Sequence, residues 1–196
     1  MRMTLLEQHT LGLESAQQKT TIQHWLTESS LHWQALIEAR KLNLSDWCLA
    51  AGFVRNLIWD RLHGRSDCTP LNDIDLIYFN PTDSTEATDR ALEAELRQRS
   101  TFPWSVKNQA RMHQRNHDAP YTSTEDAMSY WVEIETAVGA YLDADNQVRL
   151  VAPFGLEANV AGTITLNAKR PKPEVFRERI EQKGWLTHWP ELNVVE

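Results

Sequence analysis

One stretch, residues 49–79, constrains the fold of this chain more than any other. Its apolar start ends at Gly52, apolar residues then recur on one side over 53–62, and a polar loop leads to a second apolar run headed by Asp73 and Asp75. These changes of pattern predict a short strand, a glycine turn, an amphipathic helix and a second strand. Side chains two residues apart leave a strand on the same face, so we expect the two aspartates to point together.

The aspartate pair favours a metal site. Carboxylate oxygens held on one face of a strand are ligands that a divalent cation such as Mg²⁺ prefers, and that ion can hold phosphate oxygens at the same time. The alternative is that the two aspartates bind no metal, because Asp-x-Asp pairs also cap turns or lie exposed to solvent. We predict that Asp73 and Asp75 bind Mg²⁺ or Mn²⁺.

Apolar periodicity and turn residues predict the other elements. We expect one or two helices in 20–41, a strand at 47–51, a polar helix at 85–99, a strand at 104–108, a short helix capped by Ser123 or Thr124, a hairpin of 136–142 with 147–152, and a helix from Pro173 to Lys183 that stops at Gly184. Together they indicate one α+β or α/β domain over 1–196, with a helical lead-in (1–45), a core (46–170) and a C-terminal helix and tail (171–196).

Composition excludes several function classes. The net charge of −7 argues against broad binding to duplex DNA. No apolar run approaches the roughly 18 residues of a membrane span, and Glu7 interrupts any signal-peptide pattern. Cys48 and Cys68 lack metal spacing and indicate free thiols. We therefore expect a cytoplasmic protein with no membrane partner.

Other catalytic motifs are missing from the sequence. The seven glycines form no Gly-x-Gly-x-x-Gly and no Gly-Lys-Ser/Thr, so the Rossmann and P-loop phosphate sites are excluded. No Gly-x-Ser-x-Gly motif marks a hydrolase nucleophile.

The residues 52–56, Gly-Phe-Val-Arg-Asn, followed by Asp-Ile-Asp at 73–75, resemble the nucleotidyltransferase fold of polymerase-β-like enzymes, with an echo of tRNA CCA-adding enzymes. Further segments resemble an uncharacterised bacterial nucleotidyltransferase-like family: Trp59-Asp60-x-Leu62-His63-Gly64, the segment 104–113, Ala119-Pro120-Tyr121 and 152–156. The resemblance covers roughly residues 45–190. It implies an α+β fold in which helices pack a small mixed sheet, with helical N- and C-terminal extensions.

The resemblance also implies roles for individual residues. Gly52 would let the backbone approach a phosphate, and the N–H groups at the start of the following helix would face the anion. Arg55 and Asn56 would contact the nucleotide, although Arg55 could instead form a structural salt bridge with Asp60 or Asp73. The supporting pocket residues would be Lys107, Asn108 and Arg111.

The third carboxylate of active members of the superfamily, which lies on a neighbouring strand, has no obvious counterpart. The strand 104–108 offers Asn108, whose amide can ligate Mg²⁺ but cannot act as a base. Glu133 and Glu135 are the possible substitutes.

The predicted function is Mg²⁺-dependent transfer of a nucleoside monophosphate from an NTP to a hydroxyl of a small molecule, a protein or an RNA end. Asp73 and Asp75 would be the catalytic metal ligands. One alternative is a nucleotide-binding or regulatory module on the same fold that has lost the chemistry. A third hypothesis is a structural or partner-binding protein.

Overall fold

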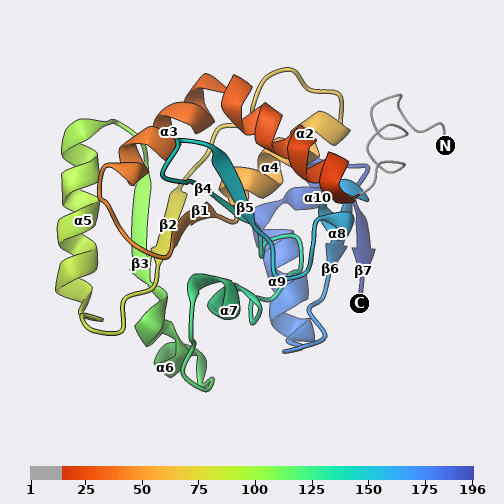
Figure 1. Cartoon of the computed structure of the whole chain (residues 1–196). Coiled ribbons are helices and arrows are strands. Elements are labelled where there is room, and N and C mark those ends of the chain that lie inside the picture. The colour runs from red at the N-terminus through yellow and green to blue at the C-terminus, as the bar shows by residue number, and fades with distance from the viewer. Residues whose placement is uncertain (1–14) are drawn as a thin grey trace.

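The computed structural model describes residues 15–196, and a five-stranded sheet lies at its centre (Figure 1). The strands are β1 (Trp47–Ala50), β2 (Ile74–Tyr78), β3 (Trp104–Asn108), β4 (Gly139–Leu142) and β5 (Val148–Val151), with β6 (Thr163–Thr165) and β7 (Asn193–Val195) in a separate pair. The helices are α2 (Ser15–Glu28), α3 (Ser30–Arg40), α4 (Gly52–Leu62), α5 (Glu86–Arg99), α6 (Met112–Asn116), α7 (Thr124–Met128), α8 (Glu157–Val160), α9 (Pro173–Lys183) and α10 (Trp185–His188), and the 3₁₀ turn η1 (Gln109–Arg111) precedes α6.

The main sheet is mixed, with the strand order β3-β2-β1-β4-β5. β2 runs parallel to β3, and α5 makes the crossover that two parallel neighbours require. The other neighbouring pairs are antiparallel, including the β4–β5 hairpin that the sequence predicts. β2 is therefore an internal strand, and each of its edges is paired.

Local signals explain where several helices begin and end. The side chain of Thr85 accepts a hydrogen bond from the Thr88 backbone N–H and caps α5, while Ser123 caps α7 by accepting from Asp126. α9 starts at Pro173 and ends at Lys183, and the next residue, Gly184, has a φ of 61°, the left-handed conformation that glycine adopts without strain. The starts of these helices and the end of α9 agree with the predicted ones.

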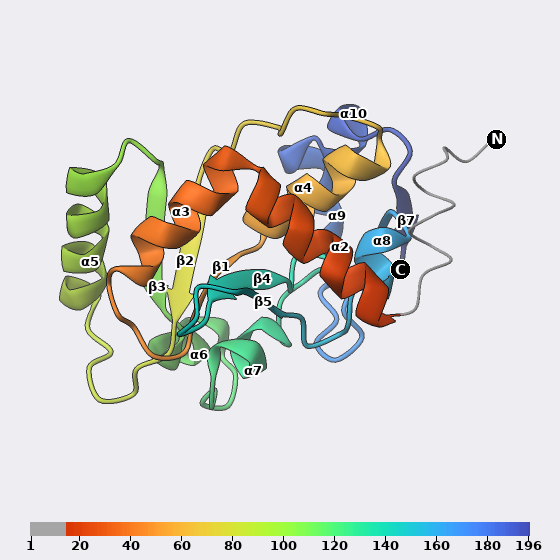
Figure 2. The same cartoon turned by 45° about the horizontal axis from the view of Figure 1, so that its top comes forward.

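Apolar residues cover both faces of the sheet. The helices α2, α3 and α4 pack over one face (Figures 1 and 2), and their buried side chains form the larger core cluster with that face. A smaller cluster lies on the opposite face and contains Cys48, Ala50, Ile77, Met128 and Ala137. Because β1 is covered on both faces, all four of its residues are buried.

The C-terminal segment packs back onto α4. The ring of Trp59, a fully buried residue of α4, meets the rings of Trp185 and Trp189 edge-on, at centroid distances of 5.7 and 5.1 Å. Parallel pairing of β6 with β7 ties the same segment to the chain that follows α8. Elements more than 100 residues apart in the sequence therefore form one wall of the molecule.

The α+β prediction is confirmed, and most of the predicted elements form. The sequence prediction missed α6, α8, α10, β6 and β7, all of five residues or fewer, which are too short for a periodic pattern to show. The predicted lead-in before residue 15 lies outside the described residues. Within 15–196, no helix has both the length and the apolar character needed to cross a membrane.

Candidate functional site

The turn from β1 into α4 forms the first part of the site. Ala51 has φ 58° and ψ −123°, and its carbonyl accepts hydrogen bonds from the N–H groups of Val54 and Arg55. Gly52 then begins α4, and no side chain caps the helix. A Cβ at Gly52 would lie 3.3 Å from Asn56 Nδ2 and 3.5 Å from Arg55 Nη2, so glycine keeps space beside these two polar groups.

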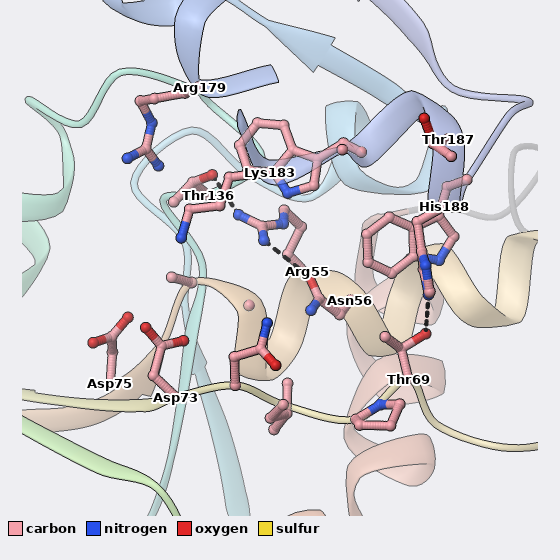
Figure 3. A pocket seen from close by; sticks show the side chains of 18 residues that line it. Arg55, Asn56, Thr69, Asp73, Asp75, Thr136, Arg179, Lys183, Thr187 and His188 are labelled. Carbon is pink, nitrogen blue, oxygen red and sulfur yellow. Dashed lines mark hydrogen bonds between the residues drawn. The ribbon is translucent and has the colours of Figure 1, made fainter. Parts of the chain in front are cut away.

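The two aspartates lie at the start of β2, as the sequence predicts. Asp73 directly precedes the strand and Asp75 is its second residue, and Figure 3 shows both carboxylates side by side, facing the cavity that separates them from the C-terminal helices. In the sheet, Asp75 is paired with Ala50 on β1 and with Ser105 on β3. Pairing with both neighbouring strands therefore fixes the position of the Asp75 backbone.

The environment of Asp75 disfavours its charged form. Burial is the main cause that raises the pKa of Asp75, and the nearby Asp73 raises it further. A hydrogen bond from Ser105 and the positive charges of Lys183 and Arg55 lower the same pKa, but they do not outweigh burial. A cation between the two carboxylates would relieve this electrostatic cost.

Arg55 is a buried cation, and no carboxylate of residues 15–196 is bonded to it. Its Nη1 donates to Thr136 Oγ1 at 2.7 Å and its Nη2 to Asn56 Oδ1 at 2.9 Å, while its buried Nε has no partner in the described part of the chain. The guanidinium lies between the rings of Trp59 and Trp185, 4.8 and 4.5 Å from their centroids. Burial lowers the pKa of Arg55 to about 10, so the side chain still carries its charge at neutral pH. The alternative of a salt bridge to Asp60 or Asp73 is not what the structure shows.

These groups line one cavity of about 630 Å³, which we call the aspartate cavity. One wall consists of the α4 start and the two aspartates, and the other comes from α9 and α10 (Figure 3). The lining residues are Ala51, Gly52, Arg55, Asn56, Thr69, Pro70, Leu71, Asn72, Asp73, Asp75, Thr136, Arg179, Lys183, Gly184, Trp185, Thr187, His188 and Trp189. The volume falls within the usual range for small-molecule sites.

Asp60 holds the loop that forms the end of the aspartate cavity. Its buried carboxylate accepts hydrogen bonds from the backbone N–H and the hydroxyl of Thr69, both at 2.6 Å, and from Trp189 Nε1 at 2.9 Å. Thr69 Oγ1 also lies 3.1 Å from Nε2 of His188 on α10. A single carboxylate thus ties the loop after α4 to the C-terminal wall.

Lys107, Asn108 and Arg111 do not line the aspartate cavity. Because β3 runs parallel to β2, Asn108 pairs with Tyr78, about 10 Å further along the strand than Asp75. The Asn108 amide is fully buried and donates to the carbonyls of Asn80 and Asp83, while Arg111 forms an ion pair with Asp89. The structure therefore groups Gly52, Arg55, Asn56 and the aspartates together, and it places these three elsewhere.

The β3 residue that lies beside Asp75 is Ser105, not Asn108. Neither glutamate that we considered lines the aspartate cavity. Glu133 is buried in a two-bond ion pair with Arg179, and Glu135 accepts from the Thr163 hydroxyl and from the N–H and hydroxyl of Thr165.

Sequence reasoning missed the residues that α9 and α10 contribute, among them Arg179, Lys183 and His188. Arg179 and Lys183 are four residues apart and so share one face of the predicted helix, which was a usable signal for a charged face. Nothing local showed that this face would lie across a cavity from the start of β2. Ser105 could have been found only from the strand register.

Comparison with known proteins agrees with this fold. A nucleotidyltransferase family matches residues 37–194. An NMR structure described as a CCA-adding enzyme head domain is 35% identical, with a TM-score of 0.76 over 90% of this chain and 95% of that one. A tRNA-processing enzyme complex, 15% identical with a TM-score of 0.51, shares the fold over 81% of this chain, which spans only 42% of that protein. No curated protein matches the chain significantly.

The predicted fold and the resemblance are thereby confirmed, since both the family match and the 35% identical structure extend over most of the chain. The chain belongs to the nucleotidyltransferase family.

Proposed function

We propose that this protein is a Mg²⁺-dependent nucleotidyltransferase that transfers a nucleoside monophosphate from an NTP to an acceptor hydroxyl. The observation that carries the proposal is the convergence of Asp73, Asp75 and Arg55 on one cavity of about 630 Å³. Family membership supports nucleotidyl transfer as the general reaction. The metal, the site residues and the acceptor are our proposals.

The donor set fits a hard divalent cation. Asp73 is exposed and Asp75 partly buried, and no cluster of three or more His, Cys, Asp or Glu that could hold a metal forms within the described part of the chain. Mg²⁺ commonly binds through one or two carboxylates and completes its shell with water and substrate phosphates, whereas a structural zinc site needs more protein ligands. When bound, the ion would neutralise phosphate charge and orient the attacking hydroxyl.

The chain's own residues would position the nucleotide. Gly52 keeps the α4 start open, so its uncapped N–H groups and the positive end of the helix dipole can face a phosphate. Arg55 is held rigidly by its partners, and the unpaired Nε adds a donor that a ligand or water can satisfy. Asn56 fixes the guanidinium through its side-chain oxygen. Such preorganised charge is the main device of phosphoryl-transfer sites.

The acceptor class includes small molecules, proteins and RNA ends. The similar NMR structure is described as a CCA-adding enzyme head domain, which favours testing an RNA end first. The net charge of −7 disfavours an acceptor held mainly through a duplex backbone. We also propose a cytoplasmic location, in keeping with the two free cysteines.

The transfer is tested with each labelled NTP, Mg²⁺ or Mn²⁺ and a cell extract. We expect a labelled acceptor and pyrophosphate release from the wild type, and a loss of both in Asp73→Asn, because the substitution keeps the side-chain volume and removes a charged ligand. Asp67→Asn, an exposed loop position outside the aspartate cavity, is the matched control and should keep full activity. Equal labelling by Asp73→Asn would refute the assigned role.

A second candidate is a module of the same family that binds nucleotide without transferring it. Ser105 favours this reading, because it faces Asp75 where a third carboxylate would act as base, and a serine hydroxyl is a poor base. Binding of Mg·NTP with no labelled product and no pyrophosphate would select this candidate. Turnover that depends on Asp73 would exclude it.

A further inference from the structure

Three strongly basic side chains line the aspartate cavity: Arg55 from α4, and Arg179 and Lys183 from α9. They differ in how many of their hydrogen-bond donors are already paired with other groups of the protein. A cation whose donors are already paired contributes a charge at a fixed position. A cation with free donors can instead move to form hydrogen bonds with a ligand. The partners of each side chain therefore indicate which one a ligand can engage.

Arg179 forms an ion pair within the protein. Its Nε and Nη2 bind the two carboxylate oxygens of Glu133 at 2.6 and 3.2 Å, and Glu133 is only 1% exposed. Removing Arg179 from this pair would leave a buried carboxylate unpaired, at a large cost in stability. Its charge is therefore balanced before any ligand arrives.

Arg55 is fixed in place. Thr136 and Asn56 each accept from its guanidinium, and two tryptophan rings enclose its faces. It can donate to a ligand that comes to it, but it cannot move towards one.

Among the residues that the structure describes, Lys183 is neither paired with a carboxylate, as Arg179 is, nor held in place by neighbouring side chains, as Arg55 is. It is the last residue of α9, exposed, and among residues 15–196 it has no hydrogen-bond or ion-pair partner. Figure 3 shows its ammonium group reaching from the C-terminal wall towards the side that carries Asp73 and Asp75. Its charge also acts on Asp75, whose pKa it lowers.

The backbone beneath Lys183 is anchored even though its tip is free. Gly184, with φ 61°, turns the chain directly after Lys183, and the next residue, Trp185, is buried against Arg55 and Trp59. The ammonium group therefore moves only within the reach of its four-carbon stem, opposite the two aspartates.

We propose that Lys183 binds the triphosphate of the nucleotide from the wall opposite the aspartates, so that α9 is part of the nucleotide site. The proposal rests on the proposed function and adds to it a residue and a ligand class: a polyphosphate chain rather than a nucleoside or a monophosphate. The two aspartates cancel the charges of Arg55 and Lys183, so the metal supplies the net positive charge that attracts a triphosphate, and loss of Lys183 would reduce that net charge.

The test is a calorimetric titration of wild type and Lys183→Gln with Mg²⁺ and three ligands: the tightest-binding NTP, inorganic tripolyphosphate, and the matching nucleoside monophosphate. A charge-assisted hydrogen bond contributes enough that Lys183→Gln should raise the Kd of the first two by about tenfold or more. The Kd of the monophosphate should change by less than about twofold. Lys183→Arg should retain most of the affinity.

Lys172→Gln is the matched control, since it removes the same charge at the other end of α9, outside the aspartate cavity. It should leave all three Kd values unchanged. If Lys183→Gln binds NTP as tightly as the wild type, or if the monophosphate weakens equally, this inference is wrong while the proposed function stands. If the wild type binds no Mg·NTP, the proposed function itself fails.

Discussion

Ala51 joins β1 to α4 in a backbone conformation that residues with a side chain rarely adopt. Its φ of 58° with ψ of −123° lies in a region that glycine enters freely. The turn needs this conformation, because the Ala51 carbonyl accepts the first hydrogen bonds of α4 and its N–H donates to the Val138 carbonyl at 2.9 Å. Strain of this kind is common where a backbone is shaped for a ligand.

We predict that Ala51→Gly stabilises the fold by about 1 kcal/mol, because the relief of backbone strain exceeds the added entropy of the unfolded chain. Urea unfolding measures the change in the free energy of unfolding. The control is Ala50→Gly, one residue earlier in the buried strand β1, which should destabilise by about 1 kcal/mol. Equal destabilisation by both substitutions would show that Ala51 is unstrained.

Among individual residues, the sequence predicted those site residues that lie close to one another in the chain. Asp73 and Asp75 face together because they are two residues apart, and Gly52 and Arg55 share the first turn of one helix. Asn108 was nominated because it lies on the correct strand, yet the parallel register places Ser105 beside Asp75 instead. The register of two strands depends on how distant segments pair, so it cannot be predicted from the spacing of residues within one strand.

Among the elements, α3 and α4 are joined by a buried histidine. His32 Nε2 lies 2.9 Å from the Phe53 carbonyl, which can only accept, so Nε2 carries the proton and Nδ1 accepts from the Ser29 hydroxyl at 2.7 Å. Burial, together with the charge of Arg61, lowers the pKa of His32 to about 4, against the raising effects of the Phe53 hydrogen bond and Asp60. The ring is therefore neutral in the folded protein at pH 7.

This lowered pKa predicts a loss of stability in mild acid. Between the ordinary histidine pKa of about 6.5 and the folded value, the unfolded chain binds a proton that the folded chain does not, so the free energy of unfolding falls as pH falls. From pH 7.5 to pH 5 we expect His32 to contribute a loss of about 2 kcal/mol. Urea unfolding at both values, with His32→Gln for comparison, measures it. An equally steep loss in His32→Gln would assign the effect to other groups.

Elements with strong end signals were predictable, and short ones were not. The caps Thr85 and Ser123 and the pair Pro173 and Gly184 mark helix ends in the sequence itself. The three-residue strands β6 and β7 form because their segments meet in space, and neither carries an alternating pattern long enough to detect.

For the whole molecule, the main consequence of the fold is that the C-terminal segment meets α4 at the site. Trp185 and Trp189 pack on Trp59, and the Trp189 indole N–H donates to Asp60, 129 residues away in the sequence. This packing brings α9 and α10 over the aspartates and completes the aspartate cavity. The sequence indicated a C-terminal helix, but its place across the aspartate cavity from β2 depends on long-range packing that no local pattern encodes.

The most direct test of the account is a calorimetric titration of each Mg·NTP into the wild type and into the double variant Asp73→Asn with Asp75→Asn. Both substitutions keep side-chain volume, and circular dichroism checks that the fold is retained. We predict that the wild type binds at least one NTP in a Mg²⁺-dependent manner and that the double variant loses this binding. Unchanged Mg·NTP affinity in a folded double variant would contradict the claim that the aspartate cavity is a metal–nucleotide site.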